Sequence, residues 1–388
     1  MNPSLISGGP VEVALDVTAV PEHPAGAGRY IVELARALAL RDDCGLRLVS
    51  RRDDAARWGE LVDYERVLAV APPGRVPRLF YEQARLASVV SRLREPPVAV
   101  HHGPHYTMPR RSKLPCVVTV HDMTFFDHPE WHEPSKVLFF RAATRYSAAH
   151  AAVIICVSET TASRLREVLS PRCPVVAVPN GVDRARFRPD EETPGSDAAV
   201  LRRLDLRQPY LFHLGTMEPR KGVVDLVAAF DLLATGQGDL ELVLAGGAGW
   251  KAKPALDAIA RAGASGRIRR LGYVADADVP ALLRCARAVV YPSLEEGFGL
   301  PALEALACGA PLVTTAGTSM AELAGQSALL VPPGQPAALA EALEAMLETA
   351  GGAENSRRRE EGLAAAARHS WDACADGHMA AYRLAVAS

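Results

Sequence analysis

Residues 291–309 read YPSLEEGFGLPALEALACG, and this stretch combines the end of an apolar strand, a glycine-containing turn and a short helix. Pro301 fits the first helical position, where its missing N–H costs no hydrogen bond, and Gly309 fits the position just past a helix end. The stretch therefore predicts a helix of about two turns that begins near Pro301. Two of its three acids, Glu296 and Glu304, are eight positions apart, one in the turn and one in the helix.

The turn before this helix predicts an anion site. Free backbone N–H groups point out of a helix N-terminus, where the helix dipole favours negative charge, and a diphosphate fits there. The groups concerned are those of Gly297, Phe298, Gly299 and Leu300. We expect Glu304 to face outward beside the diphosphate and to accept hydrogen bonds from paired hydroxyls such as those of ribose, while Glu296 holds hydroxyls of a second sugar. The spacing alone is equally consistent with an ordinary strand, loop and helix that carry two solvated glutamates.

The composition indicates a globular protein with two domains. The chain has 388 residues, and domains usually contain about 100–200. Apolar residues make up 49% of the sequence and charged residues 23%, which is typical of a soluble fold. The formal net charge is −2, so no global attraction to nucleic acid is expected.

The cysteines and the N-terminal sequence predict a cytoplasmic protein. Seven cysteines are scattered without a C-x-x-C pair, as expected of reduced core residues. The first residues, MNPSLISGGPVEVALDV, lack a basic region followed by an apolar stretch, and no run of about 18 apolar residues occurs. Export and membrane spanning are therefore not expected.

Strand-like apolar runs alternate with helical patterns in both halves of the chain, which predicts an α/β fold with doubly wound parallel sheets. The pattern breaks at 179–208, a segment rich in Pro, Asp, Glu and Arg. We expect a first domain at 1–185, a linker at 186–207 and a second domain at 208–370. Ligands of such sheets bind beyond the carboxyl ends of the strands, which places the expected site in the cleft between the domains.

The setting PS-x-x-EGFGLP-x-LEA-x-x-CG around Glu296 and Glu304 resembles the Glu-x7-Glu signature of family 4 retaining glycosyltransferases. The resemblance extends to PNGVD at 179–183, GTMEPRKG at 215–222 and LGYV at 271–274. It implies the GT-B fold, in which two Rossmann-like domains face each other across an interdomain cleft. The N-terminal domain would bind the acceptor and the C-terminal domain the nucleotide sugar. In that fold the last helix crosses back to the first domain, so residues 371–388 are expected to do so.

The resemblance also implies roles for residues of the second domain. Lys221 would stabilise the leaving diphosphate. Many family members have an arginine directly after the glycine, where this chain has Thr216 after Gly215, so the second cation is expected to be Arg220. An arginine–lysine pair at a helix start is otherwise an ordinary solvated feature. The remaining donor contacts implied are Tyr273 and Val274 beside the base, Glu304 on the ribose, and Glu296, Phe298, Gly299 and Leu300 around the donor sugar.

Two features of the first domain are candidates for the same site. The loop that contains Gly26 and Gly28 has Ile31 where a dinucleotide fingerprint requires glycine, which argues against a nicotinamide cofactor. The resemblance implies that these glycines approach the donor phosphate and the acceptor. His121 follows an apolar strand, and the family's histidine at this point contacts the donor sugar. Asp122 is expected to orient the histidine or the acceptor. A tight surface turn and a simply hydrogen-bonded histidine are the structural alternatives.

His101, His102 and His105 form a cluster that raises the question of a metal site. No neighbouring carboxylate or cysteine completes a ligand set, so acceptor contacts, with His105 the main candidate, or plain packing are favoured. Family 4 enzymes are generally metal-independent. The resemblance therefore implies no metal and no cofactor besides the donor substrate.

Residues 78–94 read RLFYEQARLASVVSRLR and predict a basic amphipathic helix. Such surfaces dock some family members on membranes. Glu82 interrupts the positive charge, and a helix that covers the sheet explains the apolar residues equally well. Peripheral contact with the inner face of the membrane therefore stays open.

The sequence as a whole predicts a retaining, metal-independent hexosyltransferase. Its donor would be a GDP- or UDP-linked sugar, and its acceptor a hydroxyl of a polysaccharide, glycolipid or natural product. Two alternatives remain open at this point. One is a nucleotide-sugar epimerase or phosphorylase of the same fold, and the other is a non-catalytic bilobed sugar-binding protein.

Overall fold

The computed structural model describes residues 9–93, 96–236, 238–349 and 351–388 and divides into two compact units. Unit 1 contains the described residues of Met1–Asp127, Pro134–Gly181 and Trp371–Ser388. Unit 2 contains those of His128–Glu133 and Val182–Ser370. The first eight residues and Arg94, on which parts of the sequence predictions fall, lie outside the described residues.

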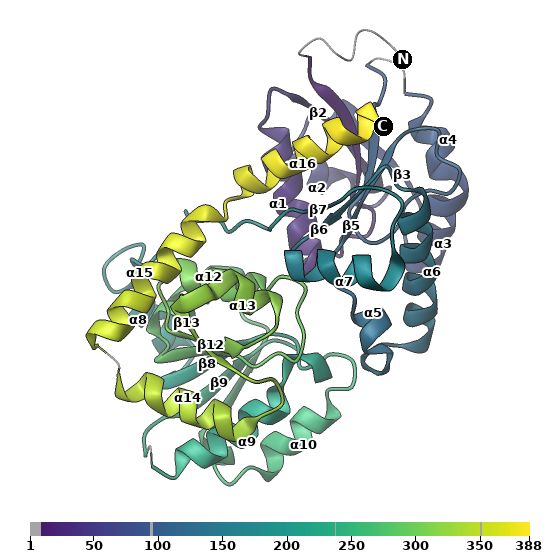
Figure 1. Cartoon of the computed structure of the whole chain (residues 1–388). Coiled ribbons are helices and arrows are strands. Elements are labelled where there is room, and N and C mark those ends of the chain that lie inside the picture. The colour runs from purple at the N-terminus through teal and green to yellow at the C-terminus, as the bar shows by residue number, and fades with distance from the viewer. Residues whose placement is uncertain (1–8, 94–95, 237, 350) are drawn as a thin grey trace. The chain divides into compact units, whose positions relative to one another are not determined.

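The centre of unit 1 is a seven-stranded sheet with the order β3-β2-β1-β4-β5-β6-β7, in which every pairing is parallel (Figure 1). The strands are β1 (Val11–Asp16), β2 (Cys44–Arg51), β3 (Val67–Ala71), β4 (Val100–Gly103), β5 (Cys116–Val120), β6 (Val153–Cys156) and β7 (Val175–Ala177). The central strands read as continuous apolar runs because both of their faces are buried. In β5, for example, all five residues of CVVTV are buried.

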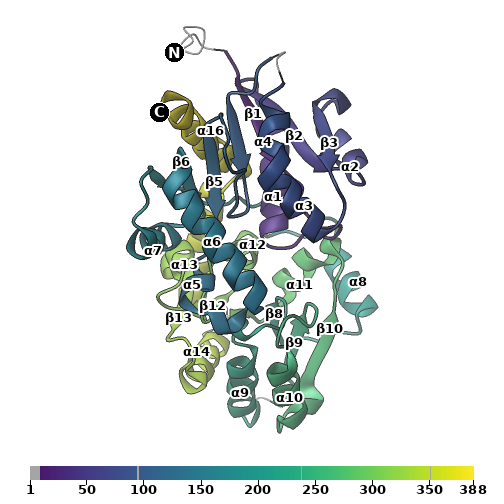
Figure 2. The same cartoon turned by 90° about the vertical axis from the view of Figure 1, so that its right-hand side faces the viewer.

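Helices cover both faces of this sheet. They are α1 (Ala27–Ala39), α2 (Ala55–Gly59), α3 (Arg75–Tyr81), α4 (Ala87–Val90), α5 (Thr124–Asp127), α6 (Pro134–His150), α7 (Glu159–Leu169) and α16 (Trp371–Ala387). Successive residues of β1 separate the two layers: Val13 and Leu15 pack in the core that includes α1 and α16, while Ala14 packs with α4. Figure 2 shows α3 and α4 in front of the sheet and α16 behind it.

Helix α16 is the last element of the chain, and it packs in unit 1 against α1 and the central strands. A chain of buried hydrogen bonds fixes it there. The Tyr30 hydroxyl lies 2.8 Å from His378 Nε2 and 2.9 Å from the Thr119 hydroxyl. His102 joins the Thr119 hydroxyl to the Tyr382 hydroxyl, with 2.8 Å to each. Burial lowers the pKa of His102, so this histidine is a neutral member of a structural network.

The prediction of one basic helix over 78–94 is wrong in its details. The described part of this segment consists of α3, a π-helical turn over Glu82–Leu86, and α4. Glu82 is buried rather than solvated, 3.8 Å from Arg78. Burial, followed by the nearby Asp16, raises the pKa of Glu82 to about 7. Leu86 and Val90 pack on the sheet, while Phe80 of α3 is exposed.

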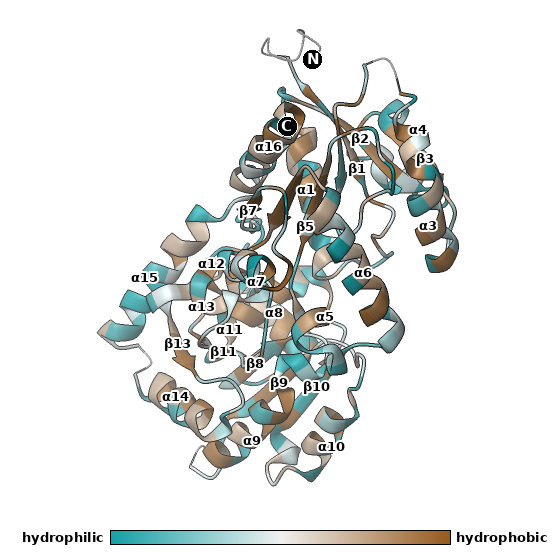
Figure 3. Cartoon of the chain, turned by 45° about the vertical axis from the view of Figure 1, so that its right-hand side comes forward, coloured by the Kyte–Doolittle hydropathy of each residue, from teal (hydrophilic) through white to brown (hydrophobic). Residues whose placement is uncertain are grey.

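Unit 2 contains a six-stranded parallel sheet with the order β10-β9-β8-β11-β12-β13. Its strands are β8 (Tyr210–Leu214), β9 (Glu241–Ala245), β10 (Ile268–Gly272), β11 (Ala288–Tyr291), β12 (Leu312–Thr315) and β13 (Ala328–Val331). Its helices are α8 (Ser196–Arg203), α9 (Val223–Ala234), α10 (Lys253–Arg261), α11 (Val279–Cys285), α12 (Leu300–Ala307), α13 (Ser319–Ala324), α14 (Pro336–Glu348) and α15 (Ala353–Arg368). Figure 3 shows strands such as β13 as predominantly hydrophobic and the surrounding helices as amphipathic. Both sheets therefore have the doubly wound strand order that the sequence predicts.

The segment expected to be a linker, 186–207, lies within unit 2 and includes α8. Its charged residues form ion pairs with α11 and the turn before it. Arg284 binds Asp197 through two hydrogen bonds of 2.6 and 2.7 Å, and Arg203 binds Asp278 through two of 2.5 and 3.0 Å. The polar composition of this segment thus reflects paired charges on a packed surface.

Across the part of the chain that the structure describes, no helix has the length and apolar character needed to cross a bilayer.

Candidate active site

In unit 2, the loops after β8 and β11 meet at the carboxyl edge of the sheet. Gly222 precedes α9 with a φ of 65°, and a Cβ atom at this position would lie 2.0 Å from the carbonyl oxygen of Pro292. Only glycine permits this close approach. The backbone N–H of Leu294 donates to the carbonyl of Arg220 at 2.8 Å, which joins the two loops. The packing brings residues 219–222 beside the turn that contains Glu296.

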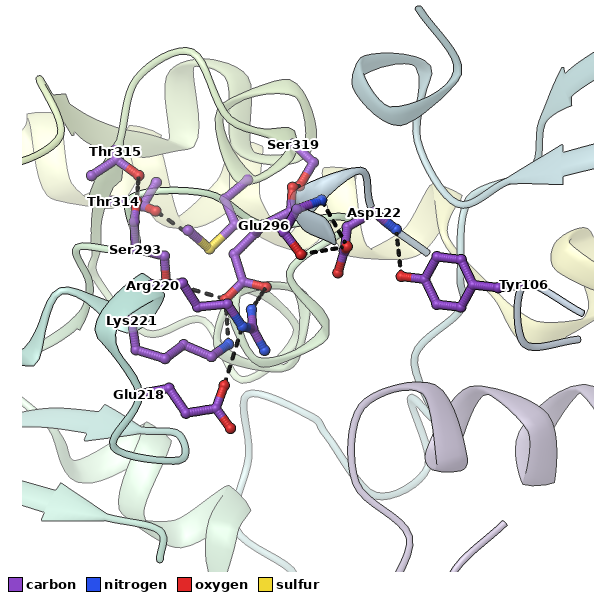
Figure 4. Close-up of polar contacts among 12 residues, drawn as sticks. Tyr106, Asp122, Glu218, Arg220, Lys221, Ser293, Glu296, Thr314, Thr315 and Ser319 are labelled. Carbon is purple, nitrogen blue, oxygen red and sulfur yellow. Dashed lines mark hydrogen bonds and ion pairs between the residues drawn. The ribbon is translucent and has the colours of Figure 1, made fainter. Parts of the chain in front are cut away.

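The side chains of Lys221 and Arg220 both bind the carboxylate of Glu296 (Figure 4). Arg220 Nη1 donates to Glu296 Oε2 at 2.9 Å, and Lys221 Nζ donates to Oε1. The Ser293 hydroxyl donates to the same Oε1 at 3.2 Å. Glu218 accepts from Arg220 Nε at 3.3 Å. We call Glu218, Arg220, Lys221 and Glu296 the ionic cluster.

The electrostatics of the ionic cluster keep Glu296 ionised. Burial alone would raise the pKa of the Glu296 carboxyl, but Lys221 and Arg220 outweigh burial and lower that pKa to about 2. Burial and the neighbouring Arg220 lower the pKa of Lys221, against the opposing effect of Glu296. Two cations and two carboxylates balance in the cluster, so a bound anion must compete with Glu296 for the two cations.

Helix α12 follows the turn, and the sequence predicts it correctly. It runs from Leu300 to Ala307, with Pro301 in the first turn and Gly309 just past the end at a φ of 68°. Gly299 precedes it with a φ of 94°, and a Cβ there would lie 2.4 Å from Met320 Cγ. The Ser319 hydroxyl donates to the carbonyl of Glu296 at 2.7 Å, which ties the turn to α13. The predicted phosphate-binding turn is therefore held by packing on both sides.

Glu304 is buried at 4% exposure, so the expectation that it faces outward is wrong. All residues of α12 from Ala302 to Ala307 are buried, so Glu304 has only a small exposed area from which to contact a ligand. Glu304 lies near Tyr291, the last residue of β11. Burial, and then Glu304, raises the pKa of Tyr291. Within the described residues, the Tyr291 hydroxyl is buried and has no hydrogen-bond partner.

The other predicted donor-side residues divide into exposed and buried ones. Tyr273, just after β10, is 75% exposed, and Thr216, just after β8, is also exposed. Val274 and Phe298 are buried at 7%, and the Phe298 ring lies 6.2 Å from that of His369. Tyr273 and Thr216 therefore lie at the surface of unit 2, while Val274 and Phe298 are packed in its interior.

In unit 1, His121 directly follows β5, at the strand end where the sequence places it. Its Nε2 donates to the carbonyl of Pro104 at 2.8 Å, and burial lowers the pKa of the imidazole. Its ring contacts three others, with centroid distances of 5.0 Å to Tyr30, 5.7 Å to His105 and 5.7 Å to Tyr106. His121 is thus a neutral histidine within an aromatic cluster that includes His105.

Asp122 has a local structural role in this unit. Its Oδ1 accepts hydrogen bonds from the backbone N–H and the hydroxyl of Thr124, at 3.1 and 2.7 Å, where α5 begins. Its own N–H donates to the Tyr106 hydroxyl at 3.1 Å. These contacts position the start of α5, a role that the sequence analysis did not foresee.

The glycine loop is close to His121 in the fold of unit 1. Gly26 immediately precedes α1 with a φ of 51°. Gly28 lies within α1, where a Cβ atom would approach Pro21 and Pro24 to 3.2 Å each. Tyr30, two residues further along the helix, makes the ring contact with His121. The fold therefore brings these predicted residues into one region of unit 1.

Comparison with known proteins identifies the family. Residues 24–186 match the family described as Glycosyltransferase Family 4, and residues 208–349 match Glycosyl transferases group 1. The O-antigen chain mannosyltransferase B of Escherichia coli is 31% identical over 378 residues, which cover 92% of this chain and 96% of that protein. The chain belongs to the family 4 glycosyltransferases. A more partial relative is the D-inositol 3-phosphate glycosyltransferase of Salinispora tropica, 35% identical over 55% of this chain and 46% of that protein.

Solved structures show that this glycosyltransferase has the GT-B fold. Sucrose-phosphate synthase from Thermosynechococcus elongatus superimposes with a TM-score of 0.77 at 20% identity, covering 96% of this chain and 98% of the other. HepE of Anabaena, in complex with UDP-glucose, superimposes with a TM-score of 0.72 at 20% identity, covering 94% of this chain and 97% of the other. The predicted fold class is confirmed.

No metal cluster is apparent in the described part of the glycosyltransferase, where no three His, Cys, Asp or Glu side chains converge as metal ligands. His101 and His102 are consecutive residues of β4, and consecutive strand residues point to opposite faces. The sequence also contains an Asp-x-Asp pattern at Asp276 and Asp278, but Asp278 is held by Arg203.

Sequence reasoning missed several polar residues around Glu296 and Arg220. Ser293 and Ser319 anchor the side chain and backbone of Glu296, and Glu218 binds Arg220. Serines near a glycine-rich turn are too common to stand out. Glu218 had a usable signal, because it lies two residues before Arg220 in a loop where a cation needs a partner.

Proposed function

We propose that this glycosyltransferase moves a hexose from a nucleoside diphosphate sugar to a hydroxyl of a growing polysaccharide, with retention at the anomeric carbon and without a metal. The observation that carries the proposal is the ionic cluster at the carboxyl edge of the unit 2 sheet, where Lys221 and Arg220 bind one carboxylate. The names of two similar proteins support the substrate classes. One is an O-antigen chain mannosyltransferase, and the other is a structure in complex with UDP-glucose. The donor nucleotide is GDP or UDP.

The diphosphate would bind where Glu296 now binds. Lys221 and Arg220 would transfer their hydrogen bonds to phosphate oxygens, and backbone N–H groups at the start of α12 would add to them. The released Glu296 carboxylate would accept hydrogen bonds from hydroxyls of the donor sugar. Glu304 would bind the ribose, and the exposed ring of Tyr273 would stack on the base.

Retention follows from a front-face reaction in this proposal. The acceptor oxygen forms its bond to the anomeric carbon as the bond to the diphosphate oxygen breaks, and the acceptor proton passes to the departing phosphate. In this proposal the released Glu296 carboxylate accepts hydrogen bonds from donor-sugar hydroxyls and does not act as a covalent nucleophile. Stabilisation of the departing negative charge is then the main catalytic contribution, and Lys221 and Arg220 supply it.

Lys221→Ala tests this proposal. Loss of one preorganised charge should reduce turnover about a hundredfold, equivalent to roughly 3 kcal/mol, while the fold is retained. Release of UDP or GDP from the corresponding glucose and mannose donors would be measured with an oligosaccharide acceptor, in the presence of EDTA. Lys253→Ala is the matched control, because Lys253 lies in the same unit but its side chain is 83% exposed and forms a local ion pair with Asp257. Unchanged turnover in Lys221→Ala would refute the assignment of the diphosphate site.

Product analysis separates the remaining alternatives. A transferase forms a new glycosidic product only when the acceptor is added. An epimerase changes the sugar nucleotide without an acceptor, and a phosphorylase requires free phosphate. Titration of UDP, GDP and ADP into the wild type and into Glu304→Ala identifies the base. Loss of the carboxylate should weaken the binding of only the nucleotide whose ribose Glu304 holds.

We place the reaction in the cytoplasm. All seven cysteines have free thiols, as expected in a reducing compartment. Binding to the inner face of the membrane through the region 75–90 is part of the same proposal. It is supported by the exposed Val76 and Phe80 of α3 beside the exposed Arg75 and Arg85. Sedimentation with anionic vesicles would test it, and no sedimentation would contradict it.

A further inference from the structure

His213 is a buried histidine near the end of β8 that the proposed chemistry does not use. The residue is 1% exposed, and its Nδ1 lies 2.9 Å from the carbonyl oxygen of Val290 on the neighbouring strand β11. A carbonyl oxygen can only accept, so Nδ1 carries the proton. Burial lowers the pKa of His213 to about 4, against the opposing effect of the Val290 carbonyl. The ring is therefore neutral near pH 7, with the lone pair on Nε2.

This lone pair has no partner in the present state. His213 Nε2 is shielded from solvent, and among the residues that the structure describes no donor is within hydrogen-bond distance of it. A buried acceptor without a donor costs free energy, so such atoms usually indicate a missing partner. The missing partner must reach Nε2 from the carboxyl edge of the sheet, where the chain leaves β8.

The space beside Gly215 connects His213 with Lys221. A Cβ atom built on Gly215 would lie 3.2 Å from His213 Nε2 and 3.9 Å from Lys221 Cδ. The imidazole acceptor and the lysine side chain thus border one small space, which the absence of a side chain at Gly215 keeps open. Lys221 Nζ is two bonds beyond Cδ, and in this structure it is turned to Glu296. An ammonium has three N–H donors and can serve more than one acceptor.

We infer that His213 is a positioning residue for Lys221, whose ammonium donates a hydrogen bond to His213 Nε2 when the donor diphosphate draws it away from Glu296. The inference rests on the proposed function, which assigns Lys221 to the diphosphate. In the free enzyme, Glu296 holds the ammonium and Nε2 is unpaired. In the donor complex, phosphate oxygens and Nε2 together hold the ammonium. A neutral acceptor suits this role because it fixes the position of the lysine without neutralising the charge that the phosphate needs.

Two substitutions of His213 separate positioning from packing. His213→Asn keeps an amide that can donate to the Val290 carbonyl but provides no acceptor at the place of Nε2. His213→Gln places an amide oxygen near that place. Calorimetric titration with UDP and GDP should show about tenfold weaker binding for His213→Asn and binding within about twofold of the wild type for His213→Gln.

The same substitution in a Lys221→Ala background provides the decisive readout. Without the lysine there is no donor for Nε2, so His213→Asn should cause no further loss of UDP or GDP affinity. A packing role would instead weaken binding equally in both backgrounds. Wild-type affinity in His213→Asn, or an equal loss in both backgrounds, would overturn the inference.

Failure of the proposed function would give a different result. In that case Lys221→Ala itself would bind UDP and GDP as tightly as the wild type, and the inference would fall with the diphosphate assignment. A weakened Lys221→Ala together with an unaffected His213→Asn would overturn the inference about His213 alone. If His213→Asn did not fold, His213→Gln in both backgrounds would still decide the question. Wild-type affinity of His213→Gln for UDP or GDP that is lost when Lys221 is also replaced by alanine supports the inference. An equal loss of affinity on His213→Gln with and without Lys221 contradicts it.

Discussion

Replacing Glu296 by alanine should tighten the binding of pyrophosphate while it slows sugar transfer. In the free enzyme, the Glu296 carboxylate occupies Lys221 and Arg220, the two cations proposed to hold the diphosphate. Every diphosphate that binds must displace that carboxylate. Removal of the carboxylate ends its hydrogen bonds to Lys221 Nζ and Arg220 Nη1, so the binding step becomes more favourable. The transfer step loses its contact to the donor sugar and should slow by at least about a hundredfold.

The structure sets the size of this effect. The two cations lower the pKa of Glu296 from its ordinary value of 4.5 to about 2 in spite of burial. At 1.36 kcal/mol for each pKa unit, the ionised form is favoured by about 3 kcal/mol, which is an upper limit on the competition. The displaced carboxylate regains solvent and sugar contacts, so we expect roughly half of this limit. Half of the limit corresponds to about tenfold tighter binding of pyrophosphate.

Isothermal titration with pyrophosphate, UDP and GDP at pH 7.5 would measure the change. Glu218→Ala is the matched control, because it also removes one carboxylate from the ionic cluster. Glu218 contacts only Arg220 within the cluster, at 3.3 Å, and its side chain is 30% exposed. Its removal should therefore change pyrophosphate affinity by less than about threefold.

Weaker or unchanged pyrophosphate binding by a folded Glu296→Ala variant would refute the reasoning. It would mean that the carboxylate and the diphosphate do not compete for the same cations. An equal gain in Glu218→Ala would also refute it, because the effect would then depend on total charge and not on the displaced carboxylate.

Three further predictions concern stability. Gly222→Ala should lower the free energy of unfolding by at least about 2 kcal/mol in denaturant titration, because Gly222 has a positive φ and a Cβ atom would clash with the carbonyl of Pro292. An unchanged free energy of unfolding would contradict the close approach of Gly222 to Pro292. Glu82→Gln should be more stable than the wild type at pH 8, with an advantage that shrinks toward pH 4.5. Because the pKa of the Glu82 carboxyl is raised to about 7 in the folded state, the wild type loses stability as the pH rises from about 4.5 to 7. A difference in unfolding free energy between the two proteins that did not change with pH would contradict this pKa. Tyr30→Phe should cost about 1–3 kcal/mol because it leaves His378 without its hydroxyl partner, and calorimetry that showed no loss would contradict the network.

Local signals made α12 and the alternation of strands and helices predictable from the sequence. Pro301 and Gly309 mark the two ends of the helix through their own backbone preferences, so its limits do not depend on distant residues. The alternation of buried strands and helices likewise depends on short-range periodicity. Short-range signals therefore suffice to predict the loops after β8 and β11 as the donor side.

Contacts between distant segments could not be predicted in this way. Lys221 and Glu296 are separated by 75 positions, and their pairing depends on the close packing of Gly222 against Pro292. The burial of Glu304 depends on the elements that surround α12, since periodicity alone placed its side chain outward. The sequence thus identified Arg220, Lys221 and Glu296 as site residues. It identified neither Glu218 nor the binding of Glu296 to the two cations.

The basic segment shows a different limit. Its periodicity predicts one continuous helix over 78–94. The π-helical turn at Glu82–Leu86 contains no glycine or proline from which it could be predicted. Likewise, the charges of 186–207 are typical of a linker, and only the structure shows that Asp197 is paired with Arg284. A polar composition indicates solvent contact, but it does not distinguish a linker from a surface of paired charges.

The position of α16 in unit 1 has a consequence for the order of synthesis and folding. Residues 371–388 supply Tyr382 and His378 to the core of unit 1, yet the ribosome makes them after all of the residues from Val182 to Ser370. At about 5–20 residues per second, those intervening residues take roughly 10–40 s to translate. During this time the nascent unit 1 exposes the apolar face that α16 later covers. Unit 2 can therefore complete its core on the ribosome before unit 1, although unit 1 is synthesised first.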